Sequence, residues 1–307
     1  MVKPTIHNPG LISWILLIIL SAIWGASFIS VSIALESLSP LILVAIRIFI
    51  AAVCLTLIAF IFGHGLPSLS SENGTQIWLH CLGMGLFSNV LPFSLLSWGQ
   101  QYVSSGFAGI SMAVVPLLVL PLSIFFIFDE KFSKQKFIGF ILGFLGVVVL
   151  VEPNSIFTLT GDHTSLARIA CLGASFCYAI GSIITRRCPE VDLISFAAAA
   201  LILSSIIITP LALTIGQIPS HISVRSLVAI SYLGLMPTAI ATILLVRIIQ
   251  TAGPAFYSQA NYQVPVWSII FGAVVLNESL PFHFFIAFSL ILAGLLIAQA
   301  KTNKSKK

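Results

Sequence analysis

One charged residue interrupts a long apolar run, and its chemistry constrains what the chain can do. Arg47 lies nine residues into the run 38–62. That is roughly 13 Å along a helix, near the middle of a hydrocarbon core about 30 Å thick. A charge at such a depth costs at least about 2.5 kcal/mol, so Arg47 is expected to face other helices or water. The chain has no Asp or Glu at this depth, so the carboxylate of a bound molecule could pair with Arg47. The alternative is that it bonds free carbonyls or extends to the membrane surface.

The run 254–276 is the most polar of the long apolar runs. Tyr257 and Asn261 are four residues apart and share one helix face. Pro265 has no N–H to give to the carbonyl of Asn261, so an acceptor is left free, and Pro116 does the same in an earlier run. Paired interruptions of this kind are typical of binding sites in membrane proteins. The alternative is that the amides hold neighbouring helices together, at about 0.6 kcal/mol each.

Aromatic and hydroxyl side chains also occur together at helical spacing. The groups are Trp24 with Ser27 and Phe28, Asn89 before Pro92, Tyr178 with Ser182, and Thr238 and Thr242 beside Pro237. They suit an amphipathic small molecule, although a Trp or Tyr in a membrane helix is more often an anchor or a packing residue. The predicted substrate-binding residues are Trp24, Arg47, Asn89, Tyr178, Tyr257 and Asn261.

Groups that could carry catalysis or hold a metal are missing from the apolar runs. The nine Asp and Glu residues and the six His residues lie in loops or at the ends of runs. The five cysteines include no C-x-x-C pair, and no hydrolase or metalloprotease motif occurs. We therefore expect no enzyme, no cofactor, no metal and no proton relay through a buried carboxylate. A channel is disfavoured because no ring of charges is evident.

The composition requires a lipid environment. Charged residues make up 7% of the 307 positions, hydrophobic residues make up 58%, and the mean hydropathy is +1.11. Soluble proteins have about 25% charged residues. The formal charge of +5 is spread over short segments between apolar runs, so no basic face for nucleic acid is expected. The expected partners are the lipid bilayer and a small-molecule substrate.

Ten apolar runs have the length of a spanning helix, and they predict an all-α polytopic membrane protein. They are 11–35, 38–62, 76–98, 104–128, 134–152, 165–187, 193–216, 225–249, 254–276 and 282–300. Runs such as 137–151 do not alternate polar and apolar residues, which excludes a β-barrel. Gly139 and Gly143 form a G-x-x-x-G pattern that predicts close packing of helices. We favour packing within one chain over packing between two chains, and the protein is a monomer or a homodimer.

The Lys and Arg residues predict the orientation, because positively charged loops stay on the cytoplasmic side. With the N-terminus inside, eleven of the fourteen cations lie in inner segments, and only Arg168 and Arg225 lie in outer segments. We therefore expect a multi-pass protein of the cell membrane, the inner membrane in a bacterium, with both termini in the cytoplasm.

The two halves of the chain resemble each other when the stretch from Gly85 is laid on the stretch from Gly234, at a constant shift of 149 residues. Matching residues include Gly85 with Gly234, Gln101 with Gln250, and Pro116 with Pro265. The predicted parts are a first unit over 1–152, a loop over 153–164, a second unit over 165–300 and a basic cytoplasmic tail over 301–307. Because each unit has five runs, the second must enter the membrane from the opposite side. This predicts two inverted repeats, an architecture typical of secondary transporters, in which a site lies between the two halves.

Several motifs resemble the EamA-type members of the drug/metabolite transporter superfamily. They are Trp24 to Phe28, Pro40 followed by Ala45 to Phe49, Gln101 to Gly106 followed by Pro116, Asp129 and Glu130, and Phe140 to Val147. Their order and spacing over nearly the whole chain carry the resemblance. It implies a ten-helix fold of two inverted five-helix repeats around a central cavity and the transport of amino acids or other small metabolites, often outward. Ile48 between Arg47 and Phe49 departs from the family pattern, and the second half has no arginine that matches Arg47.

Within such a fold, the residues favour one class of cargo. A single buried cation without a buried anion favours a zwitterion or an anion over a lipophilic cation, which usually pairs with a buried glutamate. A nucleotide derivative or a drug is the alternative cargo of the same fold.

Overall fold

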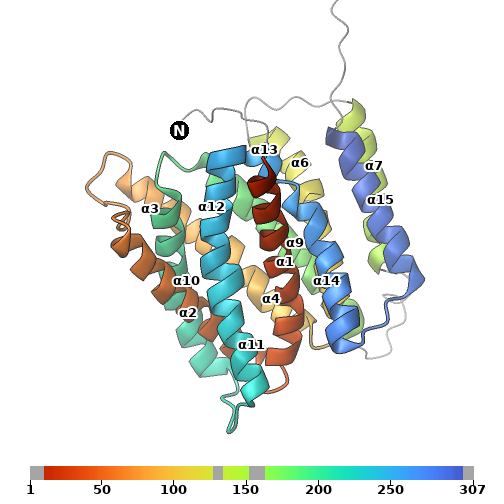
Figure 1. Ribbon diagram of the computed structural model, residues 1–307, viewed down its shortest axis with the longest axis horizontal. Coiled ribbons are helices and arrows are strands. Elements are labelled where there is room, and N and C mark those ends of the chain that lie inside the picture. Colours follow the sequence, from red (N-terminus) through yellow and green to blue (C-terminus); the bar gives the residue numbers. More distant parts are fainter. Residues whose placement is uncertain (1–9, 127–133, 152–162, 300–307) are drawn as a thin grey trace, which may run out of the picture.

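The computed structural model describes residues 10–126, 134–151 and 163–299, which form helices and no strand (Figure 1). The first half contains α1 (Leu11–Ala34), α2 (Pro40–Ile61), α3 (Gly74–Met84), η1 (Gly85–Val90), α4 (Leu91–Gly99), α5 (Ser105–Ser111), η2 (Met112–Val114), α6 (Val115–Phe126) and α7 (Lys134–Val151). The second half contains α9 (Thr164–Arg187), α10 (Leu193–Ile215), α11 (Val224–Gly234), η3 (Leu235–Ile240), α12 (Ala241–Ala252), α13 (Pro254–Tyr257), α14 (Ala260–Leu276) and α15 (Phe282–Gln299). The predicted tail over 301–307, Glu130 and most of the loop over 153–164 lie outside the described residues.

The helices have the length and composition of a multi-pass membrane protein. Within the described ranges, eight helices or unbroken helical runs could cross a bilayer, and two further apolar helices, α14 and α15, are shorter. Large apolar side chains such as Phe49, Phe60 and Phe125 are exposed on the outer faces, as expected where lipid contacts the protein. The predicted all-α, multi-pass membrane fold is confirmed.

Helices from the two halves of the chain pack against each other throughout the bundle. α1 packs against α14 and α11, α2 against α10, and α4 against α9. The hydrogen bond between Ser32 of α1 and Gln100 after α4 brings the end of α4 to the end of the bundle that contains Ala34, hereafter the Ala34 end. α13 lies at the opposite end, where the Phe256 ring contacts Trp14 near the start of α1 (Figure 1).

Glycines let α7 and α15 touch backbone to backbone at one side of the bundle (Figure 1). A Cβ on Gly139 would collide with the carbonyl oxygen of Gly294, and a Cβ on Gly146 would lie 2.8 Å from the carbonyl oxygen of Ala287. Only residues without a side chain permit such a close approach. The G-x-x-x-G pattern therefore joins two helices of the same chain, as the sequence favours.

Two of the long helical runs contain a π-helical segment of six residues, η1 between α3 and α4 and η3 between α11 and α12. Prolines account for their positions, because Pro92 and Pro237 have no N–H to give to the carbonyl four residues earlier. The sequence predicts paired interruptions at Pro116 and Pro265. The 3₁₀ turn η2 ends shortly before Pro116, and a turn at Ser258 and Gln259 separates α13 from α14, which then continues through Pro265. The two π segments are a further matched pair, in the helical runs 74–99 and 224–252.

Asp192 caps the start of α10 and links it to the segment after α2. Its carboxylate accepts hydrogen bonds from the N–H groups of Ile194 (3.0 Å) and Ser195 (2.9 Å) and lies 3.0 Å from Nδ1 of His64. Partial burial raises the pKa of this carboxyl, but the hydrogen bonds and the nearby His64 outweigh that effect. The pKa of Asp192 is therefore below its ordinary value.

We expect Asp192→Asn to destabilise the fold at pH 7 by about 0.3 to 1 kcal/mol, because asparagine still caps the helix but has no charge for the helix dipole. A lowered carboxyl pKa stabilises the fold above the unfolded-state pKa of about 3.9, and this contribution is lost as the pH falls through the folded-state pKa. The difference in thermal midpoint between the two proteins should therefore vanish in acid. An equal difference at both pH values would contradict a role for the charge.

Candidate functional site

Arg47 of α2 is buried against α4 and η3 and has few protein partners. It is 7% exposed, its Nε donates to Oγ1 of Thr238 at 3.2 Å, and its guanidinium carbon lies 3.7 Å from the centre of the Phe93 ring. No described carboxylate forms a salt bridge with Arg47, and its two terminal amino groups have no hydrogen-bond partner among the described residues. A guanidinium with both amino groups unused can bind a carboxylate through two parallel hydrogen bonds.

Pro237 and Thr238 explain how η3 binds the Arg47 side chain. Pro237 has no N–H, so the carbonyl of Leu233 lacks its usual helical donor. The Thr238 hydroxyl donates to that carbonyl across 2.9 Å, and its oxygen accepts the hydrogen bond from Arg47. The Thr238 hydroxyl therefore supplies the donor that the Leu233 carbonyl lacks and also orients the Arg47 side chain. The Thr242 hydroxyl also donates to a backbone carbonyl, that of Thr238 (2.7 Å), as threonines in membrane helices often do.

Trp24 of α1 connects the same segment to α13. Its Nε1 donates to the carbonyl of Pro237 at 3.1 Å, and its ring centre lies 6.1 Å from that of Tyr257 in an edge-to-face arrangement. Tyr232, which no sequence pattern singles out, donates its hydroxyl to the carbonyl of Ile23 (3.0 Å). These contacts make η3 and the end of α11 the common support of the aromatic side chains and Arg47.

Three further predicted residues differ in their relation to Arg47. Tyr178 of α9 packs against the apolar cluster that contains Phe93, the residue whose ring contacts the guanidinium. Asn89 instead donates to Oγ of Ser204 at 3.2 Å, which is a contact between helices, and it lies one turn before Phe93. Asn261 is half-buried in α14, and its side chain has no hydrogen bond with the described residues.

The structure therefore joins part of the predicted set. Trp24, Tyr257 and Arg47 are linked through two adjacent residues of η3, with Tyr178 packed against the apolar cluster of Phe93. Phe93 completes the surroundings of the arginine, but no sequence pattern identifies it because phenylalanine is common in every membrane helix.

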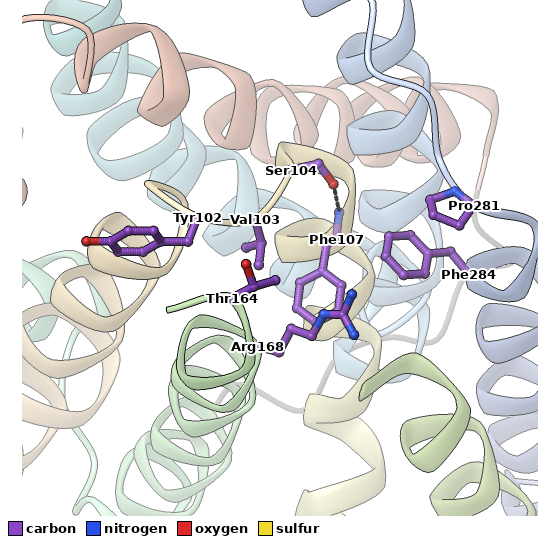
Figure 2. A pocket seen from close by; sticks show the side chains of 8 residues that line it. All are labelled: Tyr102, Val103, Ser104, Phe107, Thr164, Arg168, Pro281 and Phe284. Carbon is purple, nitrogen blue, oxygen red and sulfur yellow. Dashed lines mark hydrogen bonds between the residues drawn. The ribbon is translucent and has the colours of Figure 1, made fainter. Parts of the chain in front are cut away.

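A pocket of about 160 Å³ opens at the Ala34 end of the bundle. It is lined by Tyr102, Val103, Ser104, Phe107, Thr164, Arg168, Pro281 and Phe284. Figure 2 shows Arg168 reaching from α9 toward the Phe107 ring, with Phe284 approaching that ring from α15. Sequence patterns identify none of these residues as a site, because they come from three separate helix starts.

Glu278 binds the first turn of α5 beside this pocket. Its carboxylate accepts hydrogen bonds from the N–H of Ser105 (2.8 Å), the hydroxyl of Ser105 (3.0 Å) and the N–H of Gly106 (3.1 Å). These groups belong to the first turn of α5, where a negative charge also meets the positive end of the helix dipole. The loop between α14 and α15 is thereby bound to the start of α5.

Comparisons with known proteins identify the family. The model of the EamA-like transporter family matches residues 12–152 and 165–299. The uncharacterized transporter YoaV of Bacillus subtilis is 24% identical over 293 residues, which are 94% of this chain and 97% of that protein. An uncharacterized transporter of Archaeoglobus fulgidus is 26% identical over 292 residues, which are 94% of this chain and 99% of that protein.

A solved structure described as "Crystal structure of protein" shares the fold, with a TM-score of 0.66 at 19% identity and coverage of 94% of this chain and 96% of that chain. The family match extends over both halves of the sequence, and the described helices have the composition of membrane spans. The chain therefore belongs to the EamA-like transporter family, and the protein is a multi-pass membrane transporter.

Proposed function

We propose that the protein carries a small organic metabolite with a carboxylate group, such as an amino acid or a related zwitterion or anion, across the cell membrane by alternating access. The observation that carries the proposal is Arg47, a buried guanidinium with one hydrogen bond and no carboxylate partner among the described residues. Its burial within the membrane costs at least about 2.5 kcal/mol, which a cargo carboxylate offsets. Trp24, Tyr178 and Tyr257 supply aromatic surface for the apolar part of the cargo.

Alternating access would come from two inverted five-helix repeats, one before and one after the loop over 153–164. The two π segments support this arrangement, because Gly85 opens η1 and Gly234, 149 residues later, directly precedes η3. A Cβ on Gly85 would lie 2.9 Å from the carbonyl oxygen of Ala200, and a Cβ on Gly234 would lie 3.2 Å from that of Arg47. Ala200 is therefore the counterpart of Arg47 in the second repeat, so only the first repeat carries a buried positive charge.

The helix contacts follow the same relation between halves. α1 packs against α14 as α9 packs against α6, and α2 packs against α11 as α10 packs against α3. The family model also matches the two halves separately, over 12–152 and 165–299. With ten spans, both termini lie on one side of the membrane, and the excess of Lys and Arg in the inner segments favours the cytoplasm.

The buried polar residues favour exchange, or coupling through the charge of the cargo, over a proton relay. Among the described residues, the buried polar side chains are those of Ser, Thr, Asn, Gln and Arg47, with no Asp, Glu or His. Proton-coupled carriers commonly use buried acids or histidines for this step.

Counterflow in proteoliposomes tests the proposal. Liposomes containing the purified protein are loaded with one candidate cargo and assayed for uptake of the labelled form, over a panel of amino acids, monocarboxylates, nucleotide derivatives and lipophilic cations. We expect saturable, counterflow-stimulated uptake of carboxylate compounds that continues after an ionophore collapses the proton gradient. Uptake restricted to lipophilic cations would overturn the proposed role of Arg47, and non-saturating flux would indicate a pore.

A further inference from the structure

The charge of the Arg47 site comes from a group that is open to a ligand. Nε of Arg47 donates to Thr238, and the guanidinium carbon lies over the Phe93 ring, 3.7 Å from its centre. Neither terminal amino group has a hydrogen bond with a described residue, and neither is fully enclosed by the protein. Both amino groups therefore border space that at least a water molecule can reach. A ligand in that space meets a buried positive charge.

The acidic residues of the described segments all lie in the connections between helices. They are Glu36, Glu72, Glu190, Asp192 and Glu278. Asp192 caps the start of α10 and Glu278 caps the start of α5, and none of the five forms a salt bridge with Arg47. A positively charged group of the cargo, placed beside Arg47, would therefore find no carboxylate partner among these residues.

The other polar groups around the site are neutral. The hydroxyls of Tyr178 and Tyr257 have no hydrogen bond with the described residues and are not fully enclosed, and Asn89 donates to Ser204 at 3.2 Å. Phenols and amides carry no charge at neutral pH. They can accept a hydrogen bond from a cargo, but they cannot offset a second charge. Arg47 therefore sets the charge that the cargo must complement.

A single negative charge matches the guanidinium best. A monocarboxylate neutralises it through two parallel hydrogen bonds. In an α-amino acid the ammonium group is attached to the carbon next to the carboxylate, so it lies close to the guanidinium. The two positive charges repel each other more strongly in a buried site than in water. A second carboxylate would lose its hydration on entering the site without gaining a cation.

We propose that Arg47 selects the cargo by its net charge, so that the substrate is an organic monocarboxylate with an apolar body, no ammonium group and no second acid. This inference rests on the proposed function, which allows zwitterions and anions alike, and it chooses the anion. A hydroxyl group on the cargo is compatible with the site, because Tyr178 and Tyr257 can hydrogen-bond with it without adding charge.

A series of ligands with one common frame tests the selection by charge. Hydrocinnamate, phenyllactate, phenylalanine and benzylsuccinate differ in the group added beside the carboxylate, which is hydrogen, hydroxyl, ammonium or a second acid. Saturation-transfer NMR titrations of the purified protein in nanodiscs give the affinities. We expect hydrocinnamate and phenyllactate to bind within about threefold of each other, and phenylalanine and benzylsuccinate at least about tenfold more weakly. Isocaproate and leucine repeat the comparison with an aliphatic body.

Variants of Arg47 test the origin of the preference. In Arg47→Gln all affinities should fall, but the preference for phenyllactate over phenylalanine should shrink to about twofold or less, because the repulsion of the ammonium group is gone. Arg47→Lys keeps the charge and should keep the preference. Arg247→Gln changes an exposed arginine and should alter neither the affinities nor the preference.

The possible results separate this inference from the proposed function. If phenylalanine bound as tightly as phenyllactate, or if both bound equally weakly beside hydrocinnamate, selection by charge would be disproved and a carboxylate cargo would stand. An unchanged preference in a folded Arg47→Gln protein would disprove it as well. The comparison in the native protein decides without either variant. If no carboxylate of either series bound, the proposed function itself would be overturned.

Discussion

Arg47→Gln is expected to lower the transport efficiency for a carboxylate cargo by about 100-fold. Two parallel hydrogen bonds from a guanidinium to a carboxylate in a buried site contribute about 3 kcal/mol, and glutamine retains neither the charge nor the geometry. Initial rates of counterflow at several substrate concentrations measure the loss. Arg247→Gln removes an exposed arginine of α12 and should transport normally.

The stability of the same variant distinguishes substrate binding from a structural role. Arg47→Gln removes the free-energy cost of burying a charge within the membrane. It loses only the hydrogen bond to Thr238 and the contact with Phe93. Its thermal midpoint should therefore equal or exceed that of the native protein. A large drop in midpoint together with the loss of transport would show that the arginine holds helices together.

Thr238 provides a graded version of the test. Thr238→Val keeps the shape of the side chain but removes the hydroxyl that orients Arg47, so we expect roughly a tenfold loss in transport efficiency, expressed mainly as a weaker apparent affinity. Thr238→Ser should restore most of the activity. Arg47→Lys should fall between the native protein and Arg47→Gln, because lysine keeps the charge but not the planar pair of donors.

Glu278→Gln is expected to destabilise the protein by about 2 kcal/mol and to loosen the Ala34 end. An amide has one acceptor oxygen where the carboxylate has two, and its NH₂ group would face the donors of Ser105 and Gly106. Loss of a charged helix cap has an effect of this size. The thermal midpoint measures the stability, and alkylation of Cys171, which is fully buried and packs in one cluster with Phe107 and Phe284, measures the opening.

A matched pair of glycine variants controls for general damage. A Cβ on Gly272 would lie 2.6 Å from Oε2 of Glu278, so Gly272→Ala should displace the carboxylate and act like Glu278→Gln. Gly173 is also helical, but a Cβ there would meet only Leu95, at 3.6 Å, so Gly173→Ala should be neutral or slightly stabilising. Equal thermal midpoints and equal Cys171 alkylation in Glu278→Gln and the native protein would show that the cap does not hold this end closed. The alkylation assay requires a background in which Cys171 is the only cysteine.

Several features of the fold were predictable because the bilayer constrains them locally. An apolar run of about 20 residues must be helical to satisfy its backbone in lipid, so composition alone predicts the spans. The burial of Arg47 follows from its position in such a run, and the close packing at Gly139 follows from a spacing of four residues. The π segments were not predicted, because a membrane helix can absorb a proline in several ways and only its neighbours select one, as Pro92 and Pro265 show.

The sequence by itself determined the lipid environment, the family and the presence of one deep cation. Only the tertiary structure decided which groups meet that cation, since Thr238 lies 191 residues and Phe93 lies 46 residues from Arg47 along the chain. It likewise decided that Glu278 binds the start of α5, 173 residues away. Hydropathy and spacing describe one helix at a time, whereas these contacts depend on how the helices rotate and approach each other. That choice is made by packing across the whole bundle.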